Sequence, residues 1–327
     1  MSEPTVLRVA YTASDPYAKY LGVSLCSLLQ ANTSFSRVEC FVPDSGIRPE
    51  NKQKLLEVAA PYGCALTFLP MPDIAARLGL QGTAAKGAAM YARLLLPAVL
   101  PDAVDKILYL DCDTVVADDL AALWNTPLPN AYLAGVQDTI DAVFHKAIGL
   151  APEVPYLNAG VQLINLKRWR EENMEERFKA FIRKFQGQVP FHDQGLINGV
   201  CGADRVLLPV RYNLTSNLYS YSAQTIRRIY FLDRFYSQQE LDEAKAAPAI
   251  LHFTSGLVGR PWEEGCTHPE KERYLRAKQC TPWAQEPLAP RTLAPGTRAF
   301  AFFFRHAPRP LFETAYRALG GLRRLKR

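Results

Sequence analysis

The feature that most constrains the fold is a short apolar run that stops at two carboxylates. Residues 107–110, Ile-Leu-Tyr-Leu, are followed directly by Asp111, Cys112 and Asp113. Four consecutive apolar residues before a polar break indicate a buried strand. Side chains two positions apart share one face of an extended chain, so Asp111 and Asp113 are expected to point at one spot. Two carboxylates that close together need a divalent metal ion or a basic side chain between them.

A pair of Asp residues at this spacing is common by chance, and a solvated loop or a helix cap also explains it. Two kinds of chemistry compete with that interpretation. One is the binding of a metal-bound pyrophosphate, as in nucleotide-sugar transferases. The other is the nucleophile and acid pair of haloacid-dehalogenase-type phosphatases, whose D-x-D-x-[TV] pattern fits residues 111–115 by letter.

Strands and helices are predicted to alternate along the chain. Apolar periodicity predicts strands at 6–11, 37–42, 65–69, 107–110, 131–136, 161–164, 205–208 and 249–253, and helices at 17–30, 49–62, 84–96, 171–186 and 238–247. This alternation predicts an α/β fold with a single, mixed but mostly parallel sheet flanked by helices. The ligand crevice of such a sheet lies outside the carboxyl ends of its strands, where Asp111 and Asp113 fall. The absence of G-x-G-x-x-G and G-K-[ST] after the first strand disfavours the usual dinucleotide fold and a P-loop.

Length and composition set the broad class. A chain of 327 residues with 48% hydrophobic content can form one large α/β domain with an appendage, or two domains. The N-terminal residues form no apolar signal segment and no run of about 20 apolar residues occurs, so neither secretion nor a membrane-spanning helix is indicated. The seven cysteines are scattered without a C-x-x-C pair. This pattern favours reduced thiols in a cytoplasm over disulfides or a zinc site.

The net charge of +6 is concentrated at the C-terminus. Residues 298–327 contain eight Arg or Lys and one acid, Glu313, so the rest of the chain is close to neutral. The basic pI therefore gives no reason to expect nucleic acid as a partner. Four prolines mark a linker at 282–297, between a catalytic domain at 1–281 and the tail at 298–327. The tail combines Phe residues with Arg and Lys, a composition that suits an anionic membrane surface; a helix docked on the main domain is the alternative.

Several ordered motifs separate the two chemistries. The chain contains Tyr17-x-x-Tyr20-Leu, Tyr91-Ala-Arg93-Leu, Leu108-Tyr-Leu-Asp111-x-Asp113, Tyr156-Leu-Asn158-Ala159-Gly160-Val, Asp193-Gln194-x-x-x-Asn198, and His252-Phe253 followed by Arg260-Pro-Trp262. In these motifs it resembles glycosyltransferase family 8, most closely the bacterial lipopolysaccharide galactosyltransferases and glucosyltransferases, and glycogenin more distantly. The phosphatase is disfavoured because no late acidic pair of the G-D-x-x-x-D type is present. The D-x-D pair also comes about a hundred residues into the chain rather than near its start.

The resemblance implies a GT-A type fold and a retaining transfer of galactose or glucose from a UDP-sugar, with Mn²⁺ or, less suitably, Mg²⁺ as cofactor. It implies an oligosaccharide or lipid-linked glycan acceptor, such as lipopolysaccharide. Such an acceptor and the basic tail together predict a peripheral position on the inner face of the cell membrane. A non-catalytic sugar-nucleotide-binding protein and a membrane-binding adaptor are the remaining alternatives. The first would bind UDP without turnover, and the second would leave the D-x-D pair unused.

The resemblance also implies roles for individual residues. It assigns the metal to Asp111, Asp113 and His252, a set of two carboxylates and one imidazole that suits Mn²⁺ better than Mg²⁺. A buried, hydrogen-bonded histidine is the alternative for His252. Catalysis is assigned to Gln194, Asp193 and Arg93. Donor binding is assigned to Thr12, Ser14, Asp15, Tyr17, Arg93, Asp111, Cys112, Asn158, Ala159, Gly160, Asp193 and Arg260.

Gln194 is expected beside the anomeric carbon of the donor sugar. Because a neutral amide is a poor nucleophile, a front-face departure of the nucleotide is favoured over a covalent intermediate. Two positions depart from the family pattern. Ser14 stands where the family has an Asp that reads uracil, which leaves a different nucleotide preference open. Arg260 stands where Lys is usual, at a slightly longer spacing from His252, and is expected to contact the phosphates as a bidentate donor.

Overall fold

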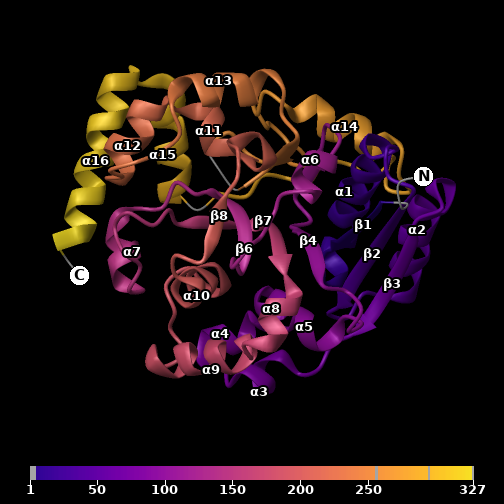
Figure 1. The fold of residues 1–327 in the computed structure, drawn as a ribbon. Helices are drawn as coiled ribbons and strands as arrows, with labels where there is room; N and C mark the ends of the chain where they lie inside the picture. The colour runs from indigo at the N-terminus through magenta and orange to yellow at the C-terminus, as the bar shows by residue number, and fades with distance from the viewer. Residues whose placement is uncertain (1–4, 255–256, 294, 326–327) are drawn as a thin grey trace.

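A computed structural model describes residues 5–254, 257–293 and 295–325 of the chain. Seven strands form the main sheet in the order β3-β2-β1-β4-β7-β6-β8, and three short strands form a second sheet in the order β5-β10-β9 (Figure 1). The main sheet contains β1 (Val6–Ala10), β2 (Arg37–Asp44), β3 (Ala65–Pro70), β4 (Lys106–Leu110), β6 (Leu133–Gln137), β7 (Leu157–Asn165) and β8 (Arg205–Leu207). The second sheet contains β5 (Thr114–Val116), β9 (Leu214–Thr215) and β10 (Ile250–His252).

The main sheet is mostly parallel, as the alternation of elements predicts. Four of its strand pairs, β1–β2, β2–β3, β1–β4 and β6–β8, are parallel, whereas β7 runs antiparallel to both β4 and β6. Two strands that are each antiparallel to the same neighbour run in the same direction. The carboxyl ends of β4 and β6 therefore meet at one edge of the sheet, and the polar residues that follow them lie close together.

The expectation of a single sheet omitted the second one. Its three strands contain only two or three residues each. Segments that short give too little alternation to be recognised from sequence, and their pairing depends on contacts between distant parts of the chain. The fold class is unaffected, because the main sheet carries the α/β architecture.

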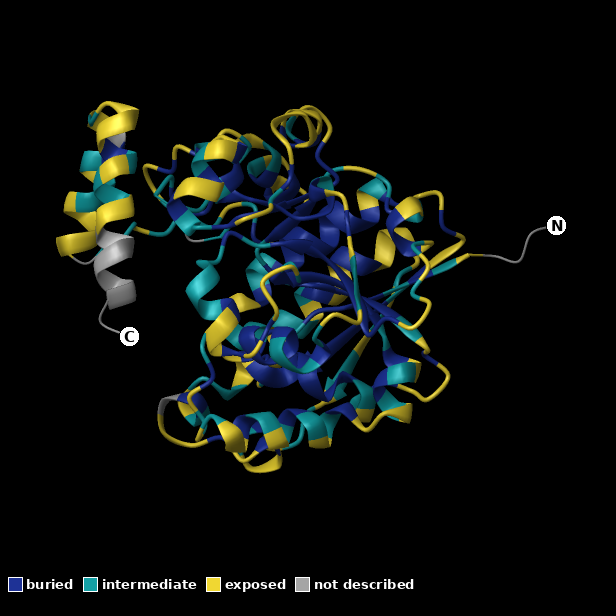
Figure 2. Ribbon diagram, turned by 60° about the vertical axis from the view of Figure 1, so that its left-hand side comes forward, coloured by how far each residue is buried: buried dark blue, intermediate teal, exposed yellow. Residues whose placement is uncertain are grey.

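Helices cover both faces of the main sheet. On one face lie α1 (Ala18–Ala31) and α2 (Pro49–Ala59), joined by the C-terminal helices α13 (Gln238–Ala246) and α14 (Lys271–Gln279). On the other face lie α3 (Ile74–Leu78), α8 (Leu166–Glu171), α9 (Met174–Lys184) and α10 (His192–Cys201), which bury Trp169 and Phe178. Figure 2 shows the sheet and the inner helix faces as one buried interior. The shorter helices are α4 (Gly82–Lys86), α5 (Leu96–Val99), α6 (Ala121–Trp124), α7 (Ala142–Ala147), α11 (Ser216–Ser220) and α12 (Ala223–Tyr230).

The segment 84–96, expected to be one helix, is a series of short helical pieces. The pieces are α4, a 3-10 helix (Ala88–Leu95) and α5. Gly87 interrupts the series between the first two pieces, and the N-terminal turn of α5 contains Pro97. Arg93 lies in the tighter 3-10 segment and is 7% exposed, so its guanidinium is turned into the protein.

The C-terminal tail folds into two helices, α15 (Pro295–His306) and α16 (Arg309–Leu325), that stand at the edge of the molecule (Figures 1 and 2). Phe312 is fully buried, and the Glu313 carboxylate accepts a 3.0 Å hydrogen bond from Thr225 and pairs with Arg228 of α12. The tail therefore docks on the main domain through α12. Residues 326 and 327 of the expected tail lie outside the described residues.

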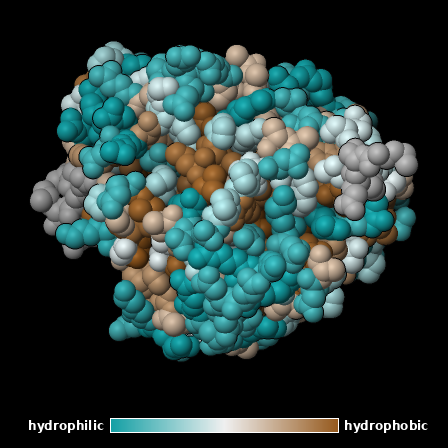
Figure 3. Space-filling model, viewed as in Figure 1, coloured by the Kyte–Doolittle hydropathy of each residue, from teal (hydrophilic) through white to brown (hydrophobic). Residues whose placement is uncertain are grey.

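Residues 282–293, the described part of the segment expected to be a linker before α15, pack on the main domain. Trp283 is buried against Gly22 of α1, and Ala289 pairs with Glu263. Across the described ranges, no helix combines the length and the apolar character needed to cross a membrane. Mostly hydrophilic side chains cover the face seen in Figure 3, with hydrophobic ones gathered in a recess across its centre.

Candidate active site

The D-x-D turn connects the two sheets. β4 ends at Leu110, and the chain turns through Asp111 and Asp113 before it re-enters the second sheet as β5. β10 pairs antiparallel with β5, and this register puts His252 opposite Thr114. The backbone N–H of Phe253 donates to the carbonyl of Asp113 at 2.9 Å. His252, which follows Asp113 by 139 positions in the sequence, is thereby held against the turn by strand pairing.

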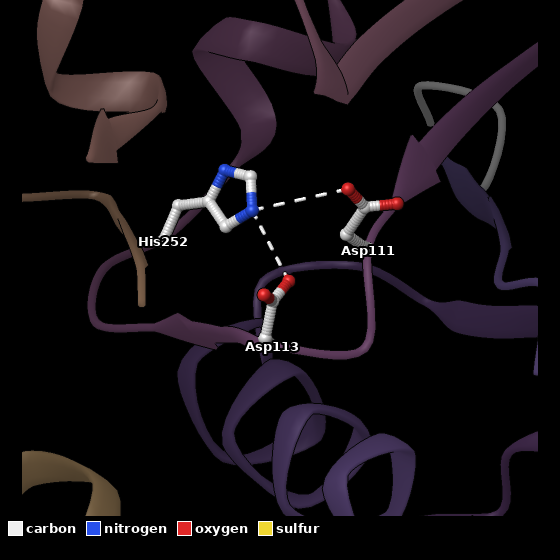
Figure 4. A group of neighbouring side chains, drawn as sticks. All are labelled: Asp111, Asp113 and His252. Carbon is white, nitrogen blue, oxygen red and sulfur yellow. Dashed lines mark ion pairs between the residues drawn. The ribbon is translucent and has the colours of Figure 1, made fainter. Parts of the chain in front are cut away.

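Asp111, Asp113 and His252 form a three-residue cluster (Figure 4). His252 Nε2 lies 3.1 Å from Asp113 Oδ1 and 3.8 Å from Asp111 Oδ2, and one ligand atom from each residue lies within 4.8 Å of the others. The other Asp111 oxygen, Oδ1, accepts hydrogen bonds from Arg93 at 2.9 Å and from the Tyr109 hydroxyl at 3.0 Å. This leaves one oxygen of Asp111 directed at the cluster. Two carboxylates and one imidazole nitrogen fit a divalent metal of the Mn²⁺ type.

A hydrogen-bond network fixes the orientation of His252. Its Nδ1 lies 2.9 Å from the amide oxygen of Asn213, whose Nδ2 donates to the amide oxygen of Asn158 at 2.8 Å. Because Asn213 uses its NH₂ group on Asn158, its oxygen accepts from Nδ1–H of the histidine. Nε2 therefore carries the lone pair and faces the two carboxylates, which is the tautomer that a metal requires.

Gly160 explains the close approach of β7 to this cluster. A Cβ atom at this position would lie 2.3 Å from His252 Cε1 and 2.7 Å from Asp111 Oδ2. Both distances are far below van der Waals contact, so a larger residue would displace the cluster. Glycine is needed here because there is no space for a Cβ atom, and not because the backbone adopts an unusual conformation.

Arg93 links the D-x-D turn to the start of α10. Its guanidinium pairs with Asp111 at 2.9 Å and with Asp193 at 2.7 Å, and it also donates to the carbonyl of Ala159. Burial lowers the pKa of Arg93, but the two carboxylates outweigh burial and raise it. Burial also raises the pKa of Asp193, with Arg93 opposing that effect. One buried cation thus holds two carboxylates at a fixed separation.

Gln194 is oriented by a carboxylate that the sequence analysis did not identify. Asp138 follows β6, and its Oδ2 accepts hydrogen bonds from Asn158 Nδ2 at 2.9 Å and from Gln194 Nε2 at 3.0 Å. The amide oxygen of Gln194 accepts from the backbone N–H of Ala159 at 2.9 Å. Both ends of this amide are therefore held. Asp138 lies two residues after the strand predicted at 131–136, and this position was the signal that could have revealed it.

A pocket of about 440 Å³ opens beside these groups. Ten of the predicted residues line it: Thr12, Ser14, Tyr17, Arg93, Asp111, Cys112, Asp113, Ala159, Asp193 and Gln194. Asn158, Gly160 and His252 lie behind this lining, where they hold other groups in place. Asn213 was also missed, and as a lone Asn before a two-residue strand it carries no recognisable pattern.

Two further predicted donor-binding residues, Asp15 and Arg260, are also absent from the pocket lining. The partly buried carboxyl of Asp15 accepts hydrogen bonds from the Arg48 backbone N–H at 2.9 Å, from Asn51 Nδ2 at 2.8 Å and from Arg48 Nε at 2.7 Å, and these lower its pKa. The structure therefore commits Asp15 to the loop that begins α2. Arg260 lies with its guanidinium 3.9 Å from Asp113 Oδ2 and 5.3 Å from the Trp262 ring. Among the described residues that follow β10, Arg260 is thus the positively charged side chain that lies closest to the D-x-D pair.

The fold and the site together define a glycosyltransferase: a GT-A type α/β sheet with a D-x-D pair and a histidine at the carboxyl edge of its strands. The sequence profile described as glycosyl transferase family 8 matches residues 8–266. The chain belongs to this family. The phosphatase alternative is unsupported, because the family match and the fold are those of glycosyltransferases.

Several of the curated proteins similar to this chain come from bacteria. General stress protein A of Bacillus subtilis is 25% identical over 286 residues, which cover 86% of this chain and 96% of that protein. A putative glycosyltransferase of Haemophilus influenzae is 31% identical over 213 residues, covering 64% of this chain and 63% of that protein. Lipopolysaccharide 1,2-glucosyltransferase of Escherichia coli is 24% identical over 284 residues, covering 86% and 80% of the two chains.

Solved structures agree with the family. The galactosyltransferase LgtC, crystallised with donor and acceptor sugar analogues, superimposes with a TM-score of 0.70 at 25% identity. The alignment covers 90% of this chain and 99% of LgtC. The GT-A fold expected from the sequence is therefore confirmed.

Proposed function

We propose that this glycosyltransferase moves a hexose, galactose or glucose, from a UDP-sugar to a saccharide acceptor, with a divalent metal and with retention at the anomeric carbon. The observation that carries the proposal is the position of Gln194 and Asp193 in the same pocket as the D-x-D pair. A donor that places its pyrophosphate at the carboxylates brings its sugar against these two residues. Asp111, Asp113 and His252 would hold Mn²⁺, with Mg²⁺ as the less suitable alternative.

The metal, when bound, neutralises the negative charge that develops on the leaving nucleotide. Arg260 adds a second positive charge on the side of Asp113. Arg93 and Asp193 hold hydroxyl groups of the donor sugar at the other end of the pocket. Gln194 contributes a fixed amide dipole beside the anomeric carbon, and its two hydrogen bonds prevent the amide from turning. An amide held in this way favours front-face departure over covalent attack.

Thr12, Ser14 and Tyr17 line the end of the pocket that would accept the nucleoside. Ser14 provides a hydroxyl where the family pattern has a carboxylate, so uracil would be read with less charge. Displacement of a fluorescent UDP analogue by UDP, GDP and CDP tests this part of the proposal. UDP should compete best, and preferential competition by GDP would overturn the choice of nucleotide.

Lipopolysaccharide or another lipid-linked surface glycan is the proposed acceptor, in line with the lipopolysaccharide glucosyltransferase of Escherichia coli among the relatives. Such an acceptor would be met on the cytoplasmic face of the cell membrane. The proposed domain organisation is a catalytic domain at 1–281, a connecting segment at 282–297 and a basic helical tail at 298–327. The family match ends at residue 266, inside the first of these segments.

The tail is proposed to contact anionic lipid. Phe302 and Leu311 are 66% and 56% exposed although the tail is docked, and Arg298 and Arg309 are exposed in the same two helices. Co-sedimentation with phosphatidylglycerol vesicles should be lost in Phe302→Asp/Leu311→Asp. Leu56→Asp, which changes a 40% exposed leucine on α2, should sediment like the native protein. Equal binding by all three proteins would contradict the proposal.

The reaction class is tested by offering two substrates. The protein should release UDP from a UDP-hexose with Mn²⁺ and leave p-nitrophenyl phosphate intact with Mg²⁺. Transfer to a soluble oligosaccharide acceptor, followed by NMR of the product, should give the donor's anomeric configuration. Release of phosphate from p-nitrophenyl phosphate without UDP-sugar turnover would favour the phosphatase instead.

A further inference from the structure

A second cavity, larger than the donor pocket, lies behind α7. Its volume is about 660 Å³, against about 440 Å³ for the donor pocket, and the two have no lining residue in common. α7 with the loop after it forms one wall, the end of β8 another, and residues 232–234 a third. In Figure 1, α7 lies beside the β6–β8 edge of the main sheet, on the side of the C-terminal helices.

The wall between the two cavities is thin. Phe144 of α7 packs edge-on against Phe191, with ring centroids 4.7 Å apart, and Phe191 lines the donor pocket. Gln137 lines the second cavity, and the next residue, Asp138, holds Gln194. The second cavity therefore lies next to the end of the donor pocket at which the sugar is proposed to react.

The second cavity contains a buried histidine with one free nitrogen. His145 is 5% exposed, stacks on Tyr156 at 5.3 Å, and lines the cavity. Its Nε2 has no hydrogen-bond partner among the described residues, while the backbone of Ile140 accepts a hydrogen bond from the ring. Burial lowers the pKa of His145, so the ring is neutral at neutral pH. The unpartnered Nε2 is consequently an acceptor for a ligand hydroxyl.

The lining of the second cavity contains equal numbers of positively and negatively charged side chains. The lining contains two cations, Lys146 and Arg234, and two carboxylates, Glu153 and Asp233, and within the part of the chain that the structure describes none of these four forms an ion pair. An anionic ligand would be attracted by the two cations and repelled by the two carboxylates, and a cationic ligand would experience the reverse. A neutral ligand with many hydroxyl groups can donate to the carboxylates and accept from the cations.

Apart from Gln137, the rest of the lining is apolar. Leu207 stands at the end of β8 and is 45% exposed, which is unusual for a leucine in a sheet. Pyranose rings present an apolar C–H face and a polar hydroxyl edge, and this lining offers a surface to each. Cavities of about 300–1,000 Å³ with mostly apolar walls and a few polar groups are typical ligand sites.

We propose that this cavity is a second saccharide site, which binds a neutral part of the glycan away from the point of transfer. The inference rests on the proposed function, because a glycan acceptor is what such a site would hold. A glycan long enough to reach both sites would stay bound between them, which raises its effective concentration at the transfer site. Short acceptors would not use the second site.

Saturation-transfer NMR with maltotriose and with lactose, in the presence of saturating UDP and Mn²⁺, measures binding outside the nucleotide site. At least one of the two should bind. In Leu207→Ser/Asp233→Asn its dissociation constant should rise by tenfold or more, and in the control Leu56→Ser it should not change. Leu207 and Leu56 are both partly exposed, so neither variant removes a fully buried side chain. A third variant, His145→Gln, replaces the free ring nitrogen with an amide oxygen and should weaken binding less than the double variant.

Binding of neither saccharide, or equal binding by the native protein and the double variant, would overturn the proposal. Tighter binding of trigalacturonate than of maltotriose would overturn it as well, because the balanced charges should not favour an anion. Mn²⁺-dependent release of UDP from UDP-hexose is measured on the same samples. If UDP release is present while saccharide binding is absent, the second site alone fails. If saccharide binding is present without UDP release, the proposed transferase reaction alone fails.

Discussion

The side chain of Asn213 holds the imidazole of His252 in a single tautomer, with Asn213 Oδ1 2.9 Å from His252 Nδ1. The same Asn213 donates to Asn158, which reaches Asp138 and, through it, Gln194. The proposed metal ligand and the proposed catalytic amide are thus connected by three side chains. A substitution at any one of these three side chains should therefore disturb the orientation of both His252 and Gln194.

Asn213→Ala should weaken binding of Mn²⁺ by about 10–100-fold, because the partner that orients the ligand histidine is lost. Isothermal titration with MnCl₂ measures this directly. The control is Asn125→Ala, which changes an exposed Asn at the end of α6. Unchanged Mn²⁺ affinity in a folded Asn213→Ala protein would show that His252 does not depend on this hydrogen bond.

Asp138→Ala should lower kcat by roughly 100-fold, the scale expected when a reacting group is misplaced by about 1 Å. KM for the UDP-sugar should change little, because Asp138 contacts Gln194 and Asn158 and does not line the donor pocket. Asp138→Asn keeps one oxygen for the same two donors and should recover part of the loss. A rise in KM without a fall in kcat would place Asp138 in donor binding instead.

Gly160→Ala should abolish metal binding while the sheet persists. The added methyl group would lie 2.3 Å from His252 Cε1 and 2.7 Å from Asp111 Oδ2. Gly135→Ala on the neighbouring strand β6 is the matched control, since its nearest contact would be the Leu157 side chain at 3.3 Å. Circular dichroism monitors folding and Mn²⁺ titration monitors the site. Full Mn²⁺ affinity in Gly160→Ala would mean that the cluster relaxes freely, contrary to this account.

Mn²⁺ affinity should rise with pH and then level off. Burial lowers the pKa of His252, but Asp113 and Asp111 outweigh burial and raise the pKa above its ordinary value. Below the raised pKa the ring is protonated and cannot ligate a metal, so Mn²⁺ has to displace a proton. Above it no proton is released and the affinity is constant. Titrations from weakly acidic to weakly alkaline pH test this expectation, and an affinity independent of pH would argue against His252 as a ligand.

The amino-acid sequence predicts most of the main sheet and part of the site. A strand that ends at two carboxylates is a local pattern, so Asp111 and Asp113 could be placed without the structure. His252 could be assigned only through the family resemblance, because its position depends on the pairing of β10 with β5, two three-residue strands. No local pattern encodes a contact between residues so far apart in the chain.

Asp138 and Asn213 show two different limits. Asp138 follows a recognisable strand, and the antiparallel position of β7 between β4 and β6 brings it to the same edge as Asp111. The strand order therefore had to be known before the carboxylate could be assigned a place. Asn213 precedes a strand of two residues and acts only through His252 and Asn158. The tertiary packing of three segments creates its role.

Release of UDP from UDP-galactose and UDP-glucose, with and without Mn²⁺, tests the central claim most directly when native protein and Asp113→Asn are compared. We expect slow Mn²⁺-dependent hydrolysis of one UDP-hexose by the native protein, lower by about a hundredfold or more in the variant. Asp102→Asn, which changes a fully exposed carboxylate, should behave like the native protein. Equal UDP release by native protein and Asp113→Asn, or release that does not depend on Mn²⁺, would contradict the account.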